Sequence, residues 1–319
     1  MSQFTAALDA FLDYLSAIEW MTLALGLAIH LVRFMVRAQA WRNILRAAYP
    51  DSYVPYRGTF GAYIAGIGVN SIVPARGGDI LKIVLAKRGV EGSTYSTVAA
   101  SLVPETLFDF FVVGGIMIWA LTQGVAPSLD TLSRLPTIDW NWLLNHPAWS
   151  LSFAALGVAV AIGAVTYGAR RVQHFWDRVS QGFAIFERPS RYVTHVAALQ
   201  AVGWLCRVAA IYCFLLAFDV PATLGNALLV IAVQSASTVL PATPGGMGTQ
   251  QGLLVYVFRG VPVSRTALLS FSVGMNLVLT AFNAAIGFAA ILIMLRTLRW
   301  RHATRSEAPG AQLGSEHTS

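Results

Sequence analysis

The chain has 319 residues, of which 56% are hydrophobic and 12% are charged, and its formal net charge is +7. Soluble domains carry about 25% charged residues, so this composition excludes a soluble catalytic domain and predicts an all-α, polytopic membrane protein. In a soluble protein the positive charge would suggest a nucleic-acid partner. Here the arginines gather at the ends of apolar segments, where they set membrane topology, and we expect no nucleic-acid partner.

The first membrane span is expected at residues 18–36, since about 20 apolar residues suffice to cross a bilayer. No Lys or Arg precedes Arg33, whereas several arginines follow up to residue 57, so the positive-inside rule places the N-terminus outside. For residues 38–48 the sequence leaves two alternatives open. This segment is either a helix lying in the membrane interface, with Trp41 at headgroup depth, or a plain basic loop.

Two short apolar runs follow, at residues 59–73 and 80–86, and each is too short to cross a bilayer alone. A helix breaker, two glycines and polar side chains mark their junction: Asn70, Pro74, Arg76, Gly77, Gly78 and Asp79. In hydrocarbon, irregular backbone is tolerated only where protein or a water-filled cavity satisfies its polar groups. Basic residues flank both ends, so the pattern predicts a Pro/Gly-broken, re-entrant hairpin that enters and leaves on the cytoplasmic side.

The middle of the chain alternates between spans and connections. Residues 93–121 predict a short half-helix that leads into an outward span, and the single basic residue in 122–147 indicates an external loop. Residues 149–167 then return inward as an ordinary span. Residues 192–218 form the next span, which is interrupted only by Arg207.

The broken pattern recurs in the second half, in the apolar runs 224–240 and 253–258. Their junction again contains helix breakers, glycines and an amide: Pro241, Gly245, Gly246 and Gln250. Residues 266–295 form the last span, and the arginines after it place the C-terminus in the cytoplasm. The tail at residues 301–319 is polar and is expected to be disordered.

Span, hairpin and span therefore occur twice within one transmembrane domain, residues 1–300. Because flanking charges fix both termini, the second hairpin must enter from outside and the first from the cytoplasm. The sequence thus predicts an inverted repeat of residues 18–122 and 192–295, joined by the intervening span. Arg259 and Arg265 oppose this arrangement, because they would lie outside.

Arg76 is the first candidate for ligand binding. A guanidinium inside a membrane is costly unless it is paired or hydrated, and it matches the oxygens of a phosphate group bidentately. Gly77 and Gly78 would let a lipid headgroup approach the backbone closely. The alternative is that Arg76 pairs with Asp79 and only holds the hairpin together.

Glu105 and Asp109 lie four residues apart, on one face of the expected helix. One interpretation is that they relay protons or coordinate a coupling cation. The other is that they are structural counterions to Arg76 or Arg207. Arg207 itself sits in the middle of a span and must face protein or water. Three amides are expected to join helices by hydrogen bonds: Gln234, Asn276 and Asn283.

Four motifs occur in order along the chain: Trp41-Arg42 after the first span, Asn70 to Lys82, Glu105 to Asp109, and Pro244 to Gln251. With these motifs the chain resembles a family of flippase-like membrane proteins related to the transmembrane region of lysylphosphatidylglycerol synthases. The resemblance covers roughly residues 20–295. It implies a protein of the cytoplasmic membrane of a prokaryote that acts on lipids.

Three positions depart from the pattern of that family. Asp79, Thr106 and Gln251 stand where the family has Glu, Arg and Glu. The last departure removes a carboxylate, which argues against a proton or cation role at that position. The chain also carries no synthase domain, so aminoacyl transfer to lipid is not expected.

Two functions of different classes follow from this sequence. The first is a lipid flippase that moves a polar or anionic headgroup between leaflets, and the second is a non-transporting accessory protein that presents lipid to a lipid-modifying enzyme. An intramembrane transferase is disfavoured because no nucleophile or metal constellation is present, so we expect no enzymatic activity, cofactor or metal. The expected substrate site combines both junctions with the charged spans: Asn70, Pro74, Arg76, Gly77, Gly78, Asp79, Glu105, Asp109, Arg207, Pro241, Gly245, Gly246 and Gln250.

Overall fold

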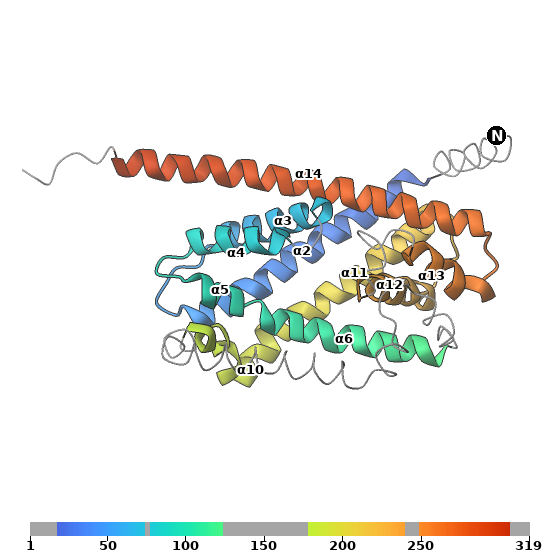
Figure 1. The fold of residues 1–319 in the computed structure, drawn as a ribbon, viewed down its shortest axis with the longest axis horizontal. Coiled ribbons are helices and arrows are strands. Elements are labelled where there is room, and N and C mark those ends of the chain that lie inside the picture. The colour runs from blue at the N-terminus through green and yellow to red at the C-terminus, as the bar shows by residue number, and fades with distance from the viewer. Residues whose placement is uncertain (1–17, 74–76, 124–177, 240–248, 307–319) are drawn as a thin grey trace, which may run out of the picture.

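The computed structural model describes residues 18–73, 77–123, 178–239 and 249–306, and the regular elements in these ranges are helical (Figure 1). Most are α-helices, with short 3-10 and π segments at connections. In chain order the elements are α2 (Trp20–Ala48), α3 (Tyr56–Ile72), α4 (Gly77–Gly89), α5 (Tyr95–Ala100), α6 (Val103–Thr122), η1 (Ala184–Glu187), α10 (Pro189–Tyr192), η2 (Val193–Ala197), α11 (Ala198–Ala217), α12 (Leu224–Val239), α13 (Thr249–Val257), η4 (Phe258–Gly260) and α14 (Arg265–Ser306).

Helices of membrane-spanning length confirm the expected polytopic membrane protein. Four stretches are long and apolar enough to cross a bilayer: Trp20–Ala48, Tyr95–Thr122, Pro189–Ala217 and Arg265–Met294. They match four of the spans expected from the sequence. The span expected at residues 149–167 lies outside the described residues.

Helix α2 corrects the prediction for residues 38–48. The helix continues without a break for 29 residues, so this segment is neither a loop nor a separate interfacial helix. Trp41 is fully buried within the protein, and Ile44 and Leu45 are buried with it. The segment contains no Gly or Pro to end the helix, and its apolar residues recur at helical spacing, so packing extends the helix beyond the first span.

The described core has two apolar clusters. One surrounds Trp41 and joins the C-terminal half of α2 to α3 and α4, and the other surrounds Phe214 and joins α11 to α12, α13 and α14. Helices α2 and α11 pack along each other and cross the molecule diagonally (Figure 1). A Cβ on Gly26 would lie 2.7 Å from the Phe214 ring, so glycine is required for this close approach.

Helices α3 and α4 form a tightly packed pair that contains the first expected junction. A Cβ on Gly66 would lie 2.8 Å from the carbonyl oxygen of Gly78, and a Cβ on Gly78 would overlap the carbonyl oxygen of Gly66. Helix α3 also meets α14 through two glycines, because a Cβ on Gly68 would lie 2.6 Å from the Cα of Gly287. Such contacts between small residues are typical of helices packed in a membrane.

The two broken segments occupy opposite halves of the long axis, with α3 and α4 in one half and α12 and α13 in the other (Figure 1). Both reach the same part of α14. Gly68 of α3 packs against the carbonyl oxygen of Asn283, while Gln250 of α13 accepts a hydrogen bond from Asn276. Seven helical residues span about 10 Å, so the inner ends of both pairs approach α14 within two turns of each other.

Candidate functional site

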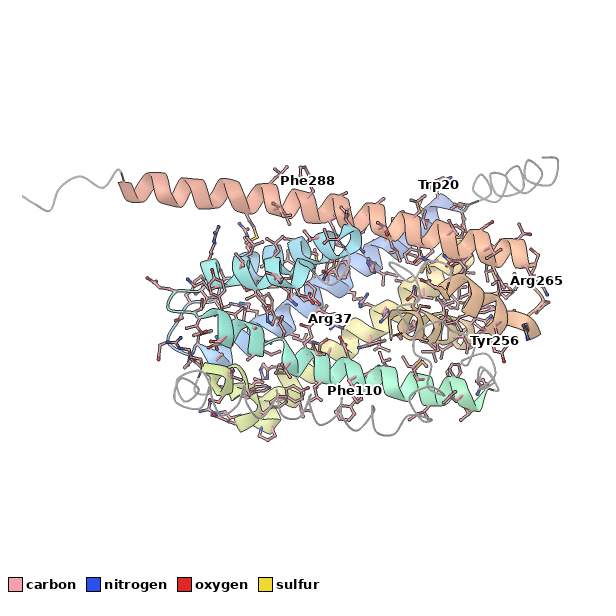
Figure 2. All side chains as sticks on the ribbon, in the orientation of Figure 1. Trp20, Arg37, Phe110, Tyr256, Arg265 and Phe288 are labelled. Carbon is pink, nitrogen blue, oxygen red and sulfur yellow. The ribbon has the colours of Figure 1, made fainter. Side chains whose placement is uncertain are left out.

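Arg37 is the centre of a buried polar cluster among the helices (Figure 2). Its guanidinium donates to Glu105 Oε1 from Nη2 at 2.6 Å and from Nε at 3.0 Å. The same group donates to Asp109, from Nη1 to Oδ1 at 2.9 Å and from Nη2 to Oδ2 at 2.6 Å. Two carboxylates of α6 therefore hold one guanidinium of α2 through paired, charge-assisted hydrogen bonds.

Two aromatic donors complete this cluster. The Tyr63 hydroxyl on α3 accepts from Arg37 Nε at 2.9 Å and donates to Glu105 Oε1 at 2.8 Å. On α11, Trp204 Nε1 donates to Asp109 Oδ1 at 2.8 Å. Side chains of α2, α3, α6 and α11 thus meet in one network, which we call the Arg37 cluster.

Lys82 brings α4 into the Arg37 cluster. Its Nζ lies 3.5 Å from Glu105 Oε2, and it also lies 4.0 Å from the centre of the Tyr63 ring and 4.4 Å from that of Trp41. A cation this close to two aromatic faces gains cation–π attraction in addition to its ion pair. Trp41 is held in turn, because its Nε1 donates to Ser101 Oγ at 3.0 Å.

Two further arginines lie beside the cluster and form no ion pair with a carboxylate in the described part of the chain. Arg207 Nη2 donates to Gln234 Oε1 at 3.2 Å, and its guanidinium stacks 4.9 Å from the Trp204 ring. The guanidinium of Arg33 lies 5.6 Å from the Phe34 ring, and its Nε has no hydrogen-bond partner among the described residues. The positive charge of Arg33 disfavours the charged form of Arg207, and the carboxylate of Asp109 partly offsets this for both arginines.

Positive charge therefore exceeds negative charge in this region. The cations are Arg33, Arg37, Lys82 and Arg207, whereas the carboxylates are Glu105, Asp109 and Asp79, the last acting on Lys82 through its charge. Buried charges are stable only when they are paired or hydrated. The excess of positive charge beside Arg33 and Arg207 would therefore favour an anion over a cation as a ligand.

A comparison with protein families decides the assignment. The family model described as the lysylphosphatidylglycerol synthase TM region matches residues 4–287. The chain belongs to this family. It is also 20% identical, over 257 residues, to a protein of Methanothermobacter thermautotrophicus named UPF0104 membrane protein, covering 76% of this chain and 75% of that relative. No solved structure matches the chain. The resemblance noted from the sequence is confirmed, and the chain is an integral membrane protein of a lipid-related family.

The first junction of this family member lies partly within the described residues. Asn70 Nδ2 donates to Asp79 Oδ1 at 3.0 Å, and Asn70 Oδ1 accepts from the backbone N–H of Gly78 at 2.8 Å. Asn70 therefore ties α3 to the first turn of α4, which begins at Gly77. Pro74 and Arg76 lie outside the described residues, as do Pro241, Gly245 and Gly246.

The remaining site residues fall into two places. Glu105 and Asp109 meet in the Arg37 cluster, with Arg207 beside it. Gln250 is buried at the second junction, where its Oε1 accepts from Asn276 Nδ2 at 3.3 Å. Asn283 bonds His30 across the α2–α14 contact at 3.2 Å, and Gln234 bonds Arg207, so the three amides join helices as the sequence predicts.

The sequence analysis missed Arg37 as the partner of the two carboxylates. The counterion interpretation named Arg76 or Arg207, because the arginines that follow Arg33 entered the prediction only as markers of membrane topology. A signal was present, since Arg33 and Arg37 lie four residues apart and share a face of α2, as Glu105 and Asp109 do on α6. A pair of arginines on one helix and a pair of carboxylates on another, with the same spacing, indicate that the two helices are in contact.

Proposed function

We propose that this protein is a flippase-like transporter that moves a lipid with a polar or anionic headgroup between leaflets. One observation supports this most strongly: Arg33 and Arg207 form no ion pair with any described carboxylate, although both lie within the helical bundle. A phosphate group placed beside them would relieve their repulsion and accept bidentate hydrogen bonds. The two arginines also lie on α2 and α11, the helices that cross the molecule together.

The arrangement of the broken segments supports movement of the lipid between leaflets. We propose that α3–α4 and α12–α13 are re-entrant hairpins of an inverted repeat that enter from opposite sides. Their inner ends both approach the middle of α14, at Asn283 and Asn276. Transporters with inverted repeats place their substrate sites where such broken helices meet near the bilayer midplane. Lipid movement breaks no covalent bond, so the proposal assigns binding roles and no catalytic role.

A second function has a specific observation in its favour. Arg37 is 5% exposed and is neutralised on both sides by Glu105 and Asp109, which is the arrangement of a structural core rather than of an open path. On this alternative the protein binds lipid and presents it to a lipid-modifying enzyme. It would then bind the same anionic headgroup but would not move it.

Lipid movement in proteoliposomes separates these functions. Purified protein is reconstituted with acyl-labelled fluorescent phosphatidylglycerol, and the label accessible to an external quencher is measured over time. We expect accelerated movement that Arg33→Gln and Arg207→Gln each reduce about tenfold, because each removes a bidentate donor. Arg57→Gln is the matched control, because Arg57 is exposed and outside the cluster. Binding without accelerated movement would favour the accessory function, and equal movement in all variants would refute the assignment of Arg33 and Arg207.

A further inference from the structure

A pocket of about 550 Å³ lies at the C-terminal end of α2, away from the Arg37 cluster. Its walls come from α2, from the connection that follows α2, and from η1, α10 and η2 of the second half. We propose that this pocket is a second anion site, which binds a phosphate group. This inference is independent of the proposed function.

Three arginines and a histidine line this pocket: Arg42, Arg46, Arg191 and His195. Arg46 and Arg191 are exposed, and neither side chain forms a hydrogen bond or ion pair within the described part of the chain. Asp51 and Glu187 are close in sequence, but neither lines the pocket. Three arginines therefore line one pocket, and no carboxylate is among its lining residues.

Two hydrogen bonds to backbone carbonyl oxygens hold the walls of the pocket together. Arg42 Nε donates to the carbonyl oxygen of Val54 at 2.8 Å, which orients the guanidinium and leaves its two terminal nitrogens for a ligand. Asn43 Nδ2 donates to the carbonyl oxygen of His195 at 2.8 Å and joins the two walls. Val54 and Ile185 are buried beneath them. These contacts fix the walls of the pocket, whereas the exposed side chains of Arg46 and Arg191 can turn toward a ligand.

Phosphate is the chemistry that fits these side chains. A guanidinium presents a planar fork of donors that matches two phosphate oxygens, and arginine is preferred over lysine where this geometry matters. The volume falls within the range of about 300–1,000 Å³ typical of small-molecule sites, which is more than one phosphate ion requires. The occupant is therefore a phosphate-bearing group, either the headgroup of an anionic lipid or a soluble phosphate compound.

Two binding measurements on the full chain distinguish these sources. Protein in phosphatidylcholine nanodiscs is titrated with inorganic pyrophosphate by calorimetry, and protein in detergent is titrated with phosphatidylglycerol by native mass spectrometry. The test variant is Arg46→Gln with Arg191→Gln, whose side chains make no described contact that folding would lose. The matched control is Arg57→Gln with Arg88→Gln, two exposed arginines that remove the same charge outside the pocket.

We expect the wild type to bind at least one probe, and the test variant to weaken that binding about tenfold or more, while the control stays within about twofold. Loss with phosphatidylglycerol alone identifies a lipid headgroup as the occupant, and loss with pyrophosphate alone identifies a soluble phosphate. Binding of neither probe, or equal weakening in the test and control variants, would overturn the proposal.

Discussion

Nη2 of Arg37 lies 2.6 Å from Oε1 of Glu105, and both side chains are buried. Removal of Arg37 would leave Lys82, at 3.5 Å, as the one cation paired with Glu105 among the described residues, and Asp109 without a described ion pair. We predict that Arg37→Ala destabilises the protein by about 3–5 kcal/mol, the usual cost of breaking a buried ion pair on one side. Thermal unfolding in detergent measures this change. Adding Glu105→Gln and Asp109→Asn should recover part of the loss, and no recovery would contradict the charge argument.

Lys82 tests the contribution of α4 to the same cluster. Lys82→Met keeps the length of the side chain but removes its charge, and with it the ion pair to Glu105 and the attraction to two rings. We predict a loss of about 2 kcal/mol, because Arg37 still neutralises Glu105. Lys87→Met on the same helix is the control, since Lys87 lies 5.3 Å from the single ring of Tyr95. Similar melting temperatures for both variants would show that the cluster does not need Lys82.

The contact between Gly68 and Gly287 predicts a steric effect. In Gly68→Ala the new methyl group would meet backbone atoms of α14, which cannot move as a side chain does, so α3 and α14 must separate. We predict a loss of about 1–3 kcal/mol in thermal unfolding. Gly115→Ala on α6 is the control, because nothing lies within 4 Å of its added Cβ and alanine favours a helix. Equal stability of both alanine variants would disprove the close contact.

The hydrogen bond between Asn70 and Asp79 allows a prediction of how the protein responds to the loss of Arg76. Asp79 already accepts a hydrogen bond from Asn70 at 3.0 Å. If Arg76 binds a headgroup, Arg76→Ala should therefore lower lipid binding and leave thermal stability almost unchanged. If Arg76 is needed to neutralise Asp79, stability should fall and Arg76→Ala with Asp79→Ala should restore it, as coupled partners do in a double-mutant cycle.

Membrane topology is tested by single cysteines on a background in which the free cysteines Cys206 and Cys213 are replaced. We predict that Arg57→Cys and Arg88→Cys are labelled from the cytoplasm. Asp219→Cys and Arg259→Cys should be labelled from outside, because the inverted repeat turns the second hairpin over. The opposite pattern at either hairpin would exclude the inverted repeat. A cross-link between cysteines at Pro74 and Pro241 would further support hairpins that meet.

Much of the fold was predictable because apolar length and flanking arginines determine spans locally. The break expected before Gly77 agrees with the end of α3 at Ile72, where Val73 is extended, whereas the junction expected at residues 241–248 lies outside the described residues. The separate helix or loop expected at residues 38–48 was wrong, because Trp41 and Arg42 resemble an interfacial segment when their partners are unknown. The pairing of charged side chains depends on how the helices pack against one another. That packing cannot be read from a single sequence.

The candidate site was predictable in its composition and less so in its pairing. Glu105 and Asp109 stood out as carboxylates within an apolar segment, and helical spacing placed them on one face. The choice of Arg37 over Arg207 depends on how α2 and α11 lie against α6, which is set by contacts such as Gly203 against Arg37. No local pattern around Glu105 specifies that arrangement.

The positions of Arg37 and Glu105 along the chain also bear on how the protein is made. They lie 68 residues apart, so α2 leaves the ribosome well before α6 is synthesised. During that interval the guanidinium has neither carboxylate, and an isolated helix with a central arginine inserts poorly. Arg37 lies toward the C-terminal end of α2, where its long side chain is able to reach the interface. We therefore expect the C-terminal part of newly made α2 to stay at the membrane interface, with its arginines in contact with lipid headgroups. The helix would reach its final depth only after α6 has been inserted beside it.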